Sequence, residues 1–420
     1  MTVSSAATRL RAARFALCSA PSPPVQTLLF LSHCCPYPPD RGEKIRAWNV
    51  LRHLAGRYRV LLGCHMTQEG DERQLDVLRG VCAEVAAFPL DKRVQKWRAL
   101  ARIRPGRPLM LDYYASRALS AWVDAAVARE RPDILYLYST AMAPYGLRHP
   151  GRRILDMVDV DSEKWAEYAQ GAGLPMRLVW AREARTLLAY ERRAAMACER
   201  TFLVSEPECR RFLELAPEAA GRVAPVENGV DLERFAPDLG LGTPYGEAGP
   251  HLAFVGNMDY WPNAQAAAWF AREVLPLVRA EAPGARFHVV GADPGPDVRA
   301  LGALPGVQVT GRVPDVRPYV AHAAAVVAPL RIARGIQNKV LEGMAMARPV
   351  IATPQAFEGI RAEPGRDILV GEGAAGFAAL VTDVLRGEHP GLGASGRRAV
   401  EQHHTWAASM RRLDGFLLRN

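Results

Sequence analysis

Short runs of aliphatic and β-branched residues alternate along the chain with longer segments of helical periodicity. Each run is followed by Gly, Pro or polar residues, which is typical of buried strands in parallel sheets. The alternation predicts an α/β fold whose sheets are covered by helices on both faces. The expected strands are 25–32, 58–65, 134–139, 153–159, 200–205, 222–228, 251–257, 286–291, 307–311, 324–330, 348–353 and 367–371. The clearest helical patterns are 44–54, 177–198, 263–282 and 339–347.

So many strands exceed what one open sheet usually holds, and the pattern breaks at residues 236–250, which are rich in Gly and Pro and have no period. We therefore expect two α/β domains, 25–235 and 251–400, joined by this linker. A C-terminal helix within 401–420 is expected to pack back on the first domain. Ligands should lie in the cleft between the domains, at the carboxyl ends of the strands.

The composition is that of a globular protein, with 49% hydrophobic and 23% charged residues among 420. No apolar run reaches the roughly 20 residues of a membrane-spanning helix. The seven cysteines form no CxxC pair, which disfavours a disulfide framework or a zinc site and favours a reducing compartment. Arginines interrupt residues 1–24, so we expect a disordered leader there, not a secretion signal, and a cytoplasmic protein.

The net charge of +9 falls almost wholly in residues 1–235, which hold 35 Lys+Arg against 27 Asp+Glu. Seven basic residues and no acidic one lie in 92–107, where Trp97, Leu100 and Ile103 recur at helical spacing. Such a helix suits an anionic membrane surface. The alternatives are a solvated helix whose apolar residues face the core, or a nucleic-acid contact, which no zinc-finger or RRM-like pattern supports. The residues assigned to the membrane surface are Trp97, Arg98, Arg102 and Arg104.

The segment 329–353 carries the strongest local signal for chemistry, because it runs as strand end, polar loop, helix, turn and strand. Gly335 leaves the backbone free to approach a ligand, and unpaired amides at the start of the helix attract phosphate. Glu342 can accept hydrogen bonds from two vicinal hydroxyls, as in a ribose; alternatively it only complements the helix dipole. Candidates for the helix cap and for positive charge here are Gln337, Asn338, Arg331, Arg334 and Lys339.

Several segments resemble, in order and spacing, the GT-B glycosyltransferases of family 4. They are PPDRGEKIRAWNVLRHLA (38–55), VENGVDLERFAP (226–237), FVGNMDYWPN (254–263) and RGIQNKVLEGMAM (334–346), the last resembling the donor signature whose usual form is E-x7-E. Together with DMVDVDSEKW (156–165) and LVSEPE (203–208), they resemble most closely the sugar transferases associated with exosortase (PEP-CTERM) exopolysaccharide loci. The resemblance covers residues 26–415.

The resemblance implies two Rossmann-like domains, a sugar nucleotide held mainly by the second, and transfer with retention and without a metal. By position, Glu342 would hold the ribose, and the loop before it, with Gly256 opposite, the diphosphate. The first Glu of E-x7-E falls at Arg334, and the family's Arg and Lys after the first strand of the second domain are replaced by residues 257–259. The phosphate charge must then be met by Arg331 or Lys339. The donor residues carried over are Gly335, Ile336, Gln337, Asn338, Lys339, Glu342, Arg331, Arg334, Gly256 and Asn257.

On the acceptor side, Asp159 and Asp161 follow a strand of the first domain and are the candidate catalytic residues. Asp161 can position an acceptor hydroxyl or stabilise positive charge at the anomeric carbon. A metal-binding DxD motif, or a polar loop that caps the next helix, are the alternatives. Gly42 permits close backbone approach at the first strand–helix turn. The basic residues near it, Arg41, Lys44 and Arg46, are expected to face the diphosphate or a phosphorylated acceptor, unless the segment is a plain loop with a solvated helix start.

Four other residues have less specific expectations. His33 is expected to be structural more than catalytic, and His404 to lie on a helix surface. Tyr260 and Trp261 either stack on the sugar or base, or pack between the domains.

Together these features predict a glycosyltransferase that moves a sugar from a UDP- or GDP-linked donor to a lipid-linked or oligosaccharide acceptor. It would act in exopolysaccharide biosynthesis at the cytoplasmic membrane face, with no cofactor and no nucleic-acid partner. A sugar-nucleotide epimerase on the same fold and a non-catalytic membrane-surface adaptor remain as alternatives.

Overall fold

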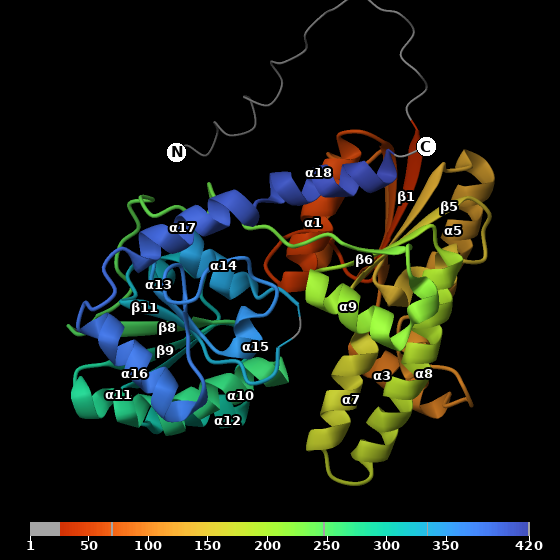
Figure 1. Ribbon diagram of the computed structural model, residues 1–420. Coiled ribbons are helices and arrows are strands. Elements are labelled where there is room, and N and C mark those ends of the chain that lie inside the picture. Colours follow the sequence, from red (N-terminus) through yellow and green to blue (C-terminus); the bar gives the residue numbers. More distant parts are fainter. Residues whose placement is uncertain (1–25, 69, 247, 334, 419–420) are drawn as a thin grey trace, which may run out of the picture.

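The computed structural model describes residues 26–68, 70–246, 248–333 and 335–418. The expected leader, 1–24, lies outside them. Two parallel sheets, each covered by helices, form two domains that lie side by side (Figure 1). The predicted α/β fold is thereby confirmed. Residues 236–250, the expected linker, contain no helix or strand among their described positions.

The first domain contains a seven-stranded sheet of order β3-β2-β1-β4-β5-β6-β7. Its strands are β1 (Thr27–Ser32), β2 (Arg59–Met66), β3 (Glu84–Pro89), β4 (Ile134–Tyr138), β5 (Arg152–Val158), β6 (Arg200–Leu203) and β7 (Val223–Pro225). Its helices are α1 (Gly42–Ala55), α2 (Leu75–Arg79), α3 (Lys92–Ala101), α4 (Leu109–Tyr113), α5 (Arg117–Glu130), α6 (Ala143–Gly146), α7 (Asp161–Gly171), α8 (Met176–Ala197) and α9 (Glu206–Leu215). Short 3₁₀ turns are η1 (Asp71–Gln74), η2 (Thr140–Met142) and η3 (Pro217–Ala219).

The strand β3 was not predicted. It is an edge strand whose residues are at most half-buried, so its sequence lacks the apolar run that marks the other strands. The central strand β1, in contrast, is buried on both faces of the sheet. Leu28 and Phe30 pack with α1, whereas Leu29 and Leu31 pack with α5 and α9, because successive side chains of a strand point to opposite faces.

The second domain contains a six-stranded sheet of order β10-β9-β8-β11-β12-β13. Its strands are β8 (His251–Val255), β9 (Arg286–Val290), β10 (Val307–Gly311), β11 (Ala325–Ala328), β12 (Val350–Ala352) and β13 (Leu369–Val370). Its helices are α10 (Trp261–Trp269), the π-helical η4 (Phe270–Val274), α11 (Leu275–Glu281), α12 (Pro296–Ala300), the 3₁₀ turn η5 (Leu301–Ala303), α13 (Arg317–Ala321), α14 (Asn338–Ala345), α15 (Pro354–Phe357), α16 (Gly373–Leu385) and α17 (Leu392–His403).

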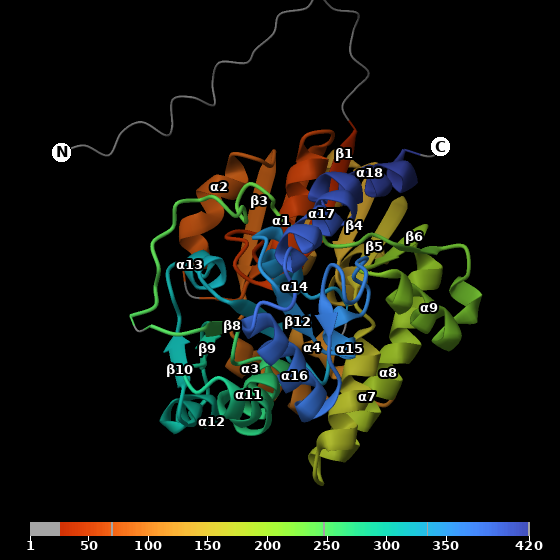
Figure 2. The same ribbon diagram turned by 60° about the vertical axis from the view of Figure 1, so that its left-hand side comes forward.

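The last helix, α18 (Trp406–Leu417), returns to the first domain and lies beside α1 (Figures 1 and 2). Met410 and Leu413 share a buried apolar cluster with α1. The preceding helix α17 packs on α14 of the second domain. The two consecutive helices therefore connect the domains at one edge.

Polar contacts join the domains at this edge. The carboxylate of Glu227 accepts hydrogen bonds from Arg361 of the second domain, at 2.6 Å, and pairs with Arg412 of α18, at 3.1 Å. His404 is fully buried, so its expected place on a helix surface is wrong. Burial lowers the pKa of His404 to about 4, so its neutral Nε2 accepts a hydrogen bond from the Arg361 amide. The backbone N–H of Val230 donates a hydrogen bond to the carbonyl of His404, so the segment around Val230 is joined to the end of α17.

A buried ion pair connects α1, β5 and the start of the interdomain connection. Arg46 Nη2 lies 2.9 Å from Asp156 Oδ1, and both side chains are fully buried. Arg46 Nη1 donates to the carbonyl of Val226 and to Asn228 Oδ1. Tyr136 donates to the second carboxylate oxygen of Asp156. The guanidinium thus fixes three distant segments to one point.

Replacement of Asp156 by Asn is expected to destabilise the first domain, because it leaves the Arg46 charge buried without its partner. Losses of about 3–5 kcal/mol are typical, which lowers Tm by roughly 10 °C in a domain of this size. Thermal unfolding followed by circular dichroism measures this. Glu281→Gln, which breaks the exposed pair with Arg386, is the matched control and should leave Tm unchanged. Equal Tm values for Asp156→Asn and the control would contradict the assigned role.

Candidate functional site

Helix α14 begins at the carboxyl end of β11, and Lys339 in its first turn reaches across to β8. Lys339 Nζ donates to Asn263 Oδ1 at 2.7 Å and lies 5.2 Å from the ring centroid of Phe254. Burial lowers the pKa of Lys339 to about 8, although Glu342 opposes the shift. A cation in this position gains stability from any anion placed beside it.

The loop after β8 approaches its neighbours closely. A Cβ on Gly256 would lie 2.8 Å from Asn263 Nδ2, and Asn263 Nδ2 donates to the carbonyl of Asn257 at 2.8 Å. Within the described part of the chain, the side-chain oxygens of Asn257 and Asn338 are buried without a hydrogen-bond partner. Buried acceptors of this kind cost free energy, which a polar ligand would offset.

The first turns of α1 and α14 lie against each other across the domain boundary. A Cβ on Gly42 would be 3.8 Å from Asn338 Nδ2. Gln337 precedes α14 and Arg41 precedes α1, and neither caps its helix through the side chain. Both helix dipoles therefore direct their positive ends to one region, which favours an anion. We call this region, formed by Gly42, Gly256, Asn257, Asn338 and Lys339, the interdomain site.

Glu342 lies further along α14 and is half-buried. Burial raises the pKa of its carboxyl to about 7, while Arg234 and Lys339 act in the opposite direction. Near neutral pH the group therefore exists in both protonation states, and it can accept hydrogen bonds from hydroxyls or donate one.

The other predicted donor residues differ in their surroundings. Ile336 is buried in the apolar cluster of the second domain, which also includes Val204 of the first. Gln337 Nε2 donates to the carbonyl of Gly335 at 3.2 Å. Arg331 is exposed, and its guanidinium lies 6.0 Å from the ring centroid of Trp269. Arg334 lies outside the described residues. Of the two cations considered for the phosphate, only Lys339 is at the interdomain site.

The predicted catalytic loop of the first domain meets the donor loop directly. Gly335 has φ +62°, and a Cβ there would lie 2.5 Å from Asp159 Oδ1. Asp161 begins α7 and pairs with Lys164 at 3.0 Å. Asp161 raises the pKa of Lys164 well above its usual value, and burial raises the pKa of Asp159. The tertiary structure thus brings together the acidic loop and the Gly335 loop.

The alternative that Asp159 and Asp161 form a metal-binding DxD motif is judged from the side chains around them. Among the described residues, no group of three or more His, Cys, Asp or Glu side chains has a metal-binding arrangement. Asp161 instead has an ammonium group as its partner.

Two of the predicted cations do not face the second domain. Lys44 Nζ lies 2.9 Å from Asp71 Oδ1, with exposed side-chain fractions of 0% and 3%, and Arg46 is bound to Asp156. The expectation that these side chains meet a phosphate is wrong for this conformation, because both are buried within the first domain. Arg41 does reach the boundary, where it pairs with Asp293 at 3.1 Å and lies 3.8 Å from Asp259.

Aromatic side chains flank the same loops. The Trp261 ring lies edge-on to Tyr168 of α7, with centroids 5.8 Å apart, which corresponds to the interdomain packing alternative. His33 stacks on Tyr138, with centroids 5.5 Å apart, and its Nδ1 lies 3.4 Å from the Tyr138 carbonyl. Burial lowers the pKa of His33, so its imidazole is neutral. These contacts place His33 at the carboxyl end of β1, beside the acceptor-side loops.

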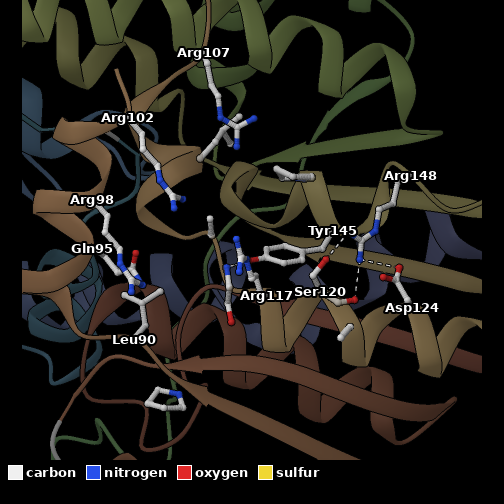
Figure 3. A pocket seen from close by; sticks show the side chains of 16 residues that line it. Leu90, Gln95, Arg98, Arg102, Arg107, Arg117, Ser120, Asp124, Tyr145 and Arg148 are labelled. Carbon is white, nitrogen blue, oxygen red and sulfur yellow. Dashed lines mark hydrogen bonds and ion pairs between the residues drawn. The ribbon is translucent and has the colours of Figure 1, made fainter. Parts of the chain in front are cut away.

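Helix α3 buries Ala99 and partly buries Leu100, but other apolar residues in and just after it are exposed. Trp97 is 73% exposed and Ile103 is 50% exposed, so the alternative of a core-facing stripe is wrong for both residues. Arg98 and Arg102 line a pocket of about 720 Å³ in the first domain (Figure 3). Arg104 is exposed. No helix in the described part of the chain is long and apolar enough to cross a membrane.

Comparisons with known proteins bear on both domains. Residues 249–386 match the model of a family described as glycosyl transferases group 1. Sucrose-phosphate synthase (tll1590) from Thermosynechococcus elongatus is similar in structure over 94% of this chain and 98% of its own, with a TM-score of 0.69 and 17% identity. Anabaena HepE (Alr3699), in complex with UDP and glucose, is similar over 94% and 99%, with a TM-score of 0.65 and 14% identity. None of the curated proteins compared with the chain matches its sequence.

WaaG, a glycosyltransferase involved in lipopolysaccharide biosynthesis, is similar over 93% of this chain and 99% of its own, with a TM-score of 0.62 and 14% identity. Identities this low show the fold alone. They confirm the predicted GT-B arrangement, in which two Rossmann-like domains with parallel sheets lie next to each other. The family match covers most of the second domain, including Lys339 and Glu342.

The raised pKa of Glu342 predicts a specific dependence of stability on pH. The carboxyl loses its proton near pH 4.5 when unfolded and at about 7 when folded, so the folded state binds more protons between these values. Stability contributed by protonated Glu342 is therefore lost as the pH rises from 4.5 through 7. Glu342→Gln stays neutral, and its Tm should rise relative to wild type across this window and then stay constant.

Thermal unfolding at pH 5, 6, 7 and 8 measures the difference. Glu358→Gln replaces an exposed carboxyl of the same domain and is the control. A difference between Glu342→Gln and wild type that did not change with pH would contradict the buried position assigned to this carboxyl.

Proposed function

We propose that the protein is a glycosyltransferase that takes a sugar from a nucleotide-sugar and passes it to a glycan acceptor. The observation that carries this proposal is the interdomain site, where Lys339, two helix N-termini and two unsatisfied amide oxygens face one region. Phosphate binds well to uncapped helix N-termini with a nearby cation. The match of residues 249–386 to the glycosyl transferases group 1 family supports the same conclusion.

In this proposal, the α14 amides and Lys339 hold the diphosphate, and Glu342 accepts hydrogen bonds from the ribose hydroxyls. UDP is the first nucleotide to test, since HepE is known in complex with UDP and with UDP-glucose. GDP is the second. No cofactor is needed, because the charge of the leaving group is met by the side chain and amides of the chain itself.

We further propose that transfer retains the anomeric configuration. The bond from the anomeric carbon to the diphosphate oxygen breaks, and the acceptor oxygen bonds to the same face of that carbon. The proton of the acceptor hydroxyl passes to the departing phosphate. Asp161 positions the acceptor hydroxyl, and the direct contact of Asp159 with Gly335 aligns the acceptor loop with the donor loop. Domain closure excludes water from the reaction.

The proposed setting is exopolysaccharide biosynthesis of the exosortase-associated kind, with a lipid-linked acceptor at the cytoplasmic membrane face. Helix α3 supports membrane contact, since it exposes Trp97 and Val94 among Lys92, Arg93 and Lys96. Apolar side chains within a basic surface bind anionic lipid by burial and charge together.

Calorimetric titration of UDP and GDP into wild-type protein and Glu342→Ala tests the donor site. We expect one nucleotide to bind with micromolar Kd and the variant to bind about 10–100-fold more weakly, because charge-assisted hydrogen bonds are lost. Glu358→Ala, at an exposed position of the same domain, is the matched control and should bind as wild type does.

Each other outcome has a definite meaning. Equal binding by Glu342→Ala and wild type would remove Glu342 from the site while keeping the transferase proposal. Absence of binding to either nucleotide by wild type would overturn the proposal in favour of a membrane-surface adaptor. A nucleotide-sugar altered without any acceptor present would instead identify a sugar-nucleotide epimerase.

The membrane proposal is tested with vesicles that contain an anionic phospholipid. Trp97→Ser and Arg104→Glu should each weaken co-sedimentation roughly tenfold, through lost apolar burial and reversed charge respectively. Leu277→Ser, which alters an exposed apolar residue of the second domain, is the control. Unchanged sedimentation of both α3 variants would contradict the assignment.

A further inference from the structure

Five arginines converge on the 720 Å³ pocket of the first domain (Figure 3). The pocket lies between α3, α5 and α6, and its volume is in the range of sites for small ligands. Arg98 lies in α3, Arg102 is the residue that follows this helix, and Arg117 is the first residue of α5. The remaining two are Arg107 and Arg148.

These arginines are only partly neutralised. Arg107 pairs with Asp112 at 3.0 Å, and Arg148 pairs with Asp124 at 2.8 Å. For the other three, no hydrogen bond or ion pair joins the side chain to another residue in the described ranges; these are Arg98, Arg102 and Arg117. Like charges gathered in one pocket repel each other, so an anion bound there would relieve the repulsion.

The pocket is linked to the acceptor side of the interdomain site through Tyr145 and Tyr114. Tyr145, which lines the pocket, donates its hydroxyl proton to the Tyr114 carbonyl at 2.6 Å and accepts from the Ser116 amide at 2.7 Å. The ring of Tyr114 in turn lies edge-on to His33, with centroids 5.7 Å apart. Two side chains thus separate the arginines from the residue at the carboxyl end of β1.

We propose that this pocket binds a phosphate or diphosphate group of the acceptor. The identification of the ligand as the acceptor rests on the proposed glycosyltransferase function, whereas anion binding by the pocket does not. Guanidinium groups bind phosphate oxygens through paired N–H donors, and a diphosphate brings at least two negative charges to Arg98, Arg102 and Arg117, which have no partner among the described residues.

The same phosphate chemistry has two sources. One is a soluble phosphorylated glycan, and the other is the headgroup of a lipid-linked glycan. Helix α3 bears on the second source, because it supplies Arg98 to the pocket and exposes Trp97 to the surroundings. A lipid headgroup in the pocket would have its chain next to this exposed apolar side chain.

Titration calorimetry with inorganic pyrophosphate and with a soluble short-chain alkyl diphosphate tests the proposal. The nucleotide that binds best, UDP or GDP, is present at saturation so that the donor site is filled. We expect Arg98→Gln/Arg102→Gln to bind both probes at least about tenfold more weakly than wild type. The control Lys92→Gln/Lys96→Gln removes the same charge from the same helix outside the pocket and should bind both probes as wild type does.

Binding to phosphatidylcholine vesicles with and without a polyprenyl phosphate distinguishes the two sources. Selective binding to the phosphate-bearing vesicles, lost in Arg98→Gln/Arg102→Gln, identifies a lipid headgroup. If Arg98→Gln/Arg102→Gln loses pyrophosphate binding while wild type shows no preference for the phosphate-bearing vesicles, the ligand is a soluble phosphorylated acceptor. Equal losses of pyrophosphate binding in the pocket variant and the Lys92→Gln/Lys96→Gln control, or no loss in either, would overturn the proposal.

Nucleotide titration of the same variants separates this proposal from the previous one. The pocket variant should bind the nucleotide as wild type does, which also shows that it is folded. If wild type bound neither UDP nor GDP, the glycosyltransferase proposal would fall, and selective loss of pyrophosphate binding would still establish the anion site. If nucleotide bound normally while the pocket variant kept its affinity for pyrophosphate, the pocket proposal alone would fall.

Discussion

The buried pair of Arg46 and Asp156 is the contact on which the position of the interdomain site depends. Arg46 belongs to the helix whose first turn meets α14, and Asp156 lies on the strand that leads to Asp159. The same guanidinium binds the carbonyl of Val226, where the chain leaves the first domain. An isolated charge would be very costly at zero exposure, so the contact has few alternatives, and the three segments are held in one arrangement.

Around this fixed point, both candidate sites contain positive charge that the described chain does not fully offset. Lys339 is desolvated enough to lower its pKa to about 8, and the pocket arginines outnumber the carboxylates beside them. Such arrangements lower the stability of the free protein, and a bound anion offsets this cost. The arginine pocket belongs to the first domain and Lys339 to the second, as the proposed transfer requires of the acceptor and the donor.

Much of the fold was predictable, because strand and helix patterns are local. The one missed strand, β3, is half-buried at a sheet edge and therefore carries no clear apolar run. The helix that carries Lys339 was also predicted, since a glycine-bearing loop before a helix has a short sequence signature. The predictions for Lys44 and His404 were wrong because they depend on contacts that are distant in the sequence. Their burial depends on Asp71 and on the Arg361 amide, which lie 27 and 43 residues away in the chain.

The sequence by itself determined the two parallel sheets, the break between them and the loop that carries Gly335, because each follows from residues within one short segment. Only the tertiary structure decided which cations are available to a ligand. Arg46 finds its carboxylate 110 residues away, and Arg41 finds Asp293 at a separation of 252. Arg98, Arg102 and Arg117 have no such partner in the described chain, yet in sequence they are equally basic. The energy of a charge depends on its distance from other charges in space, which composition and periodicity do not contain.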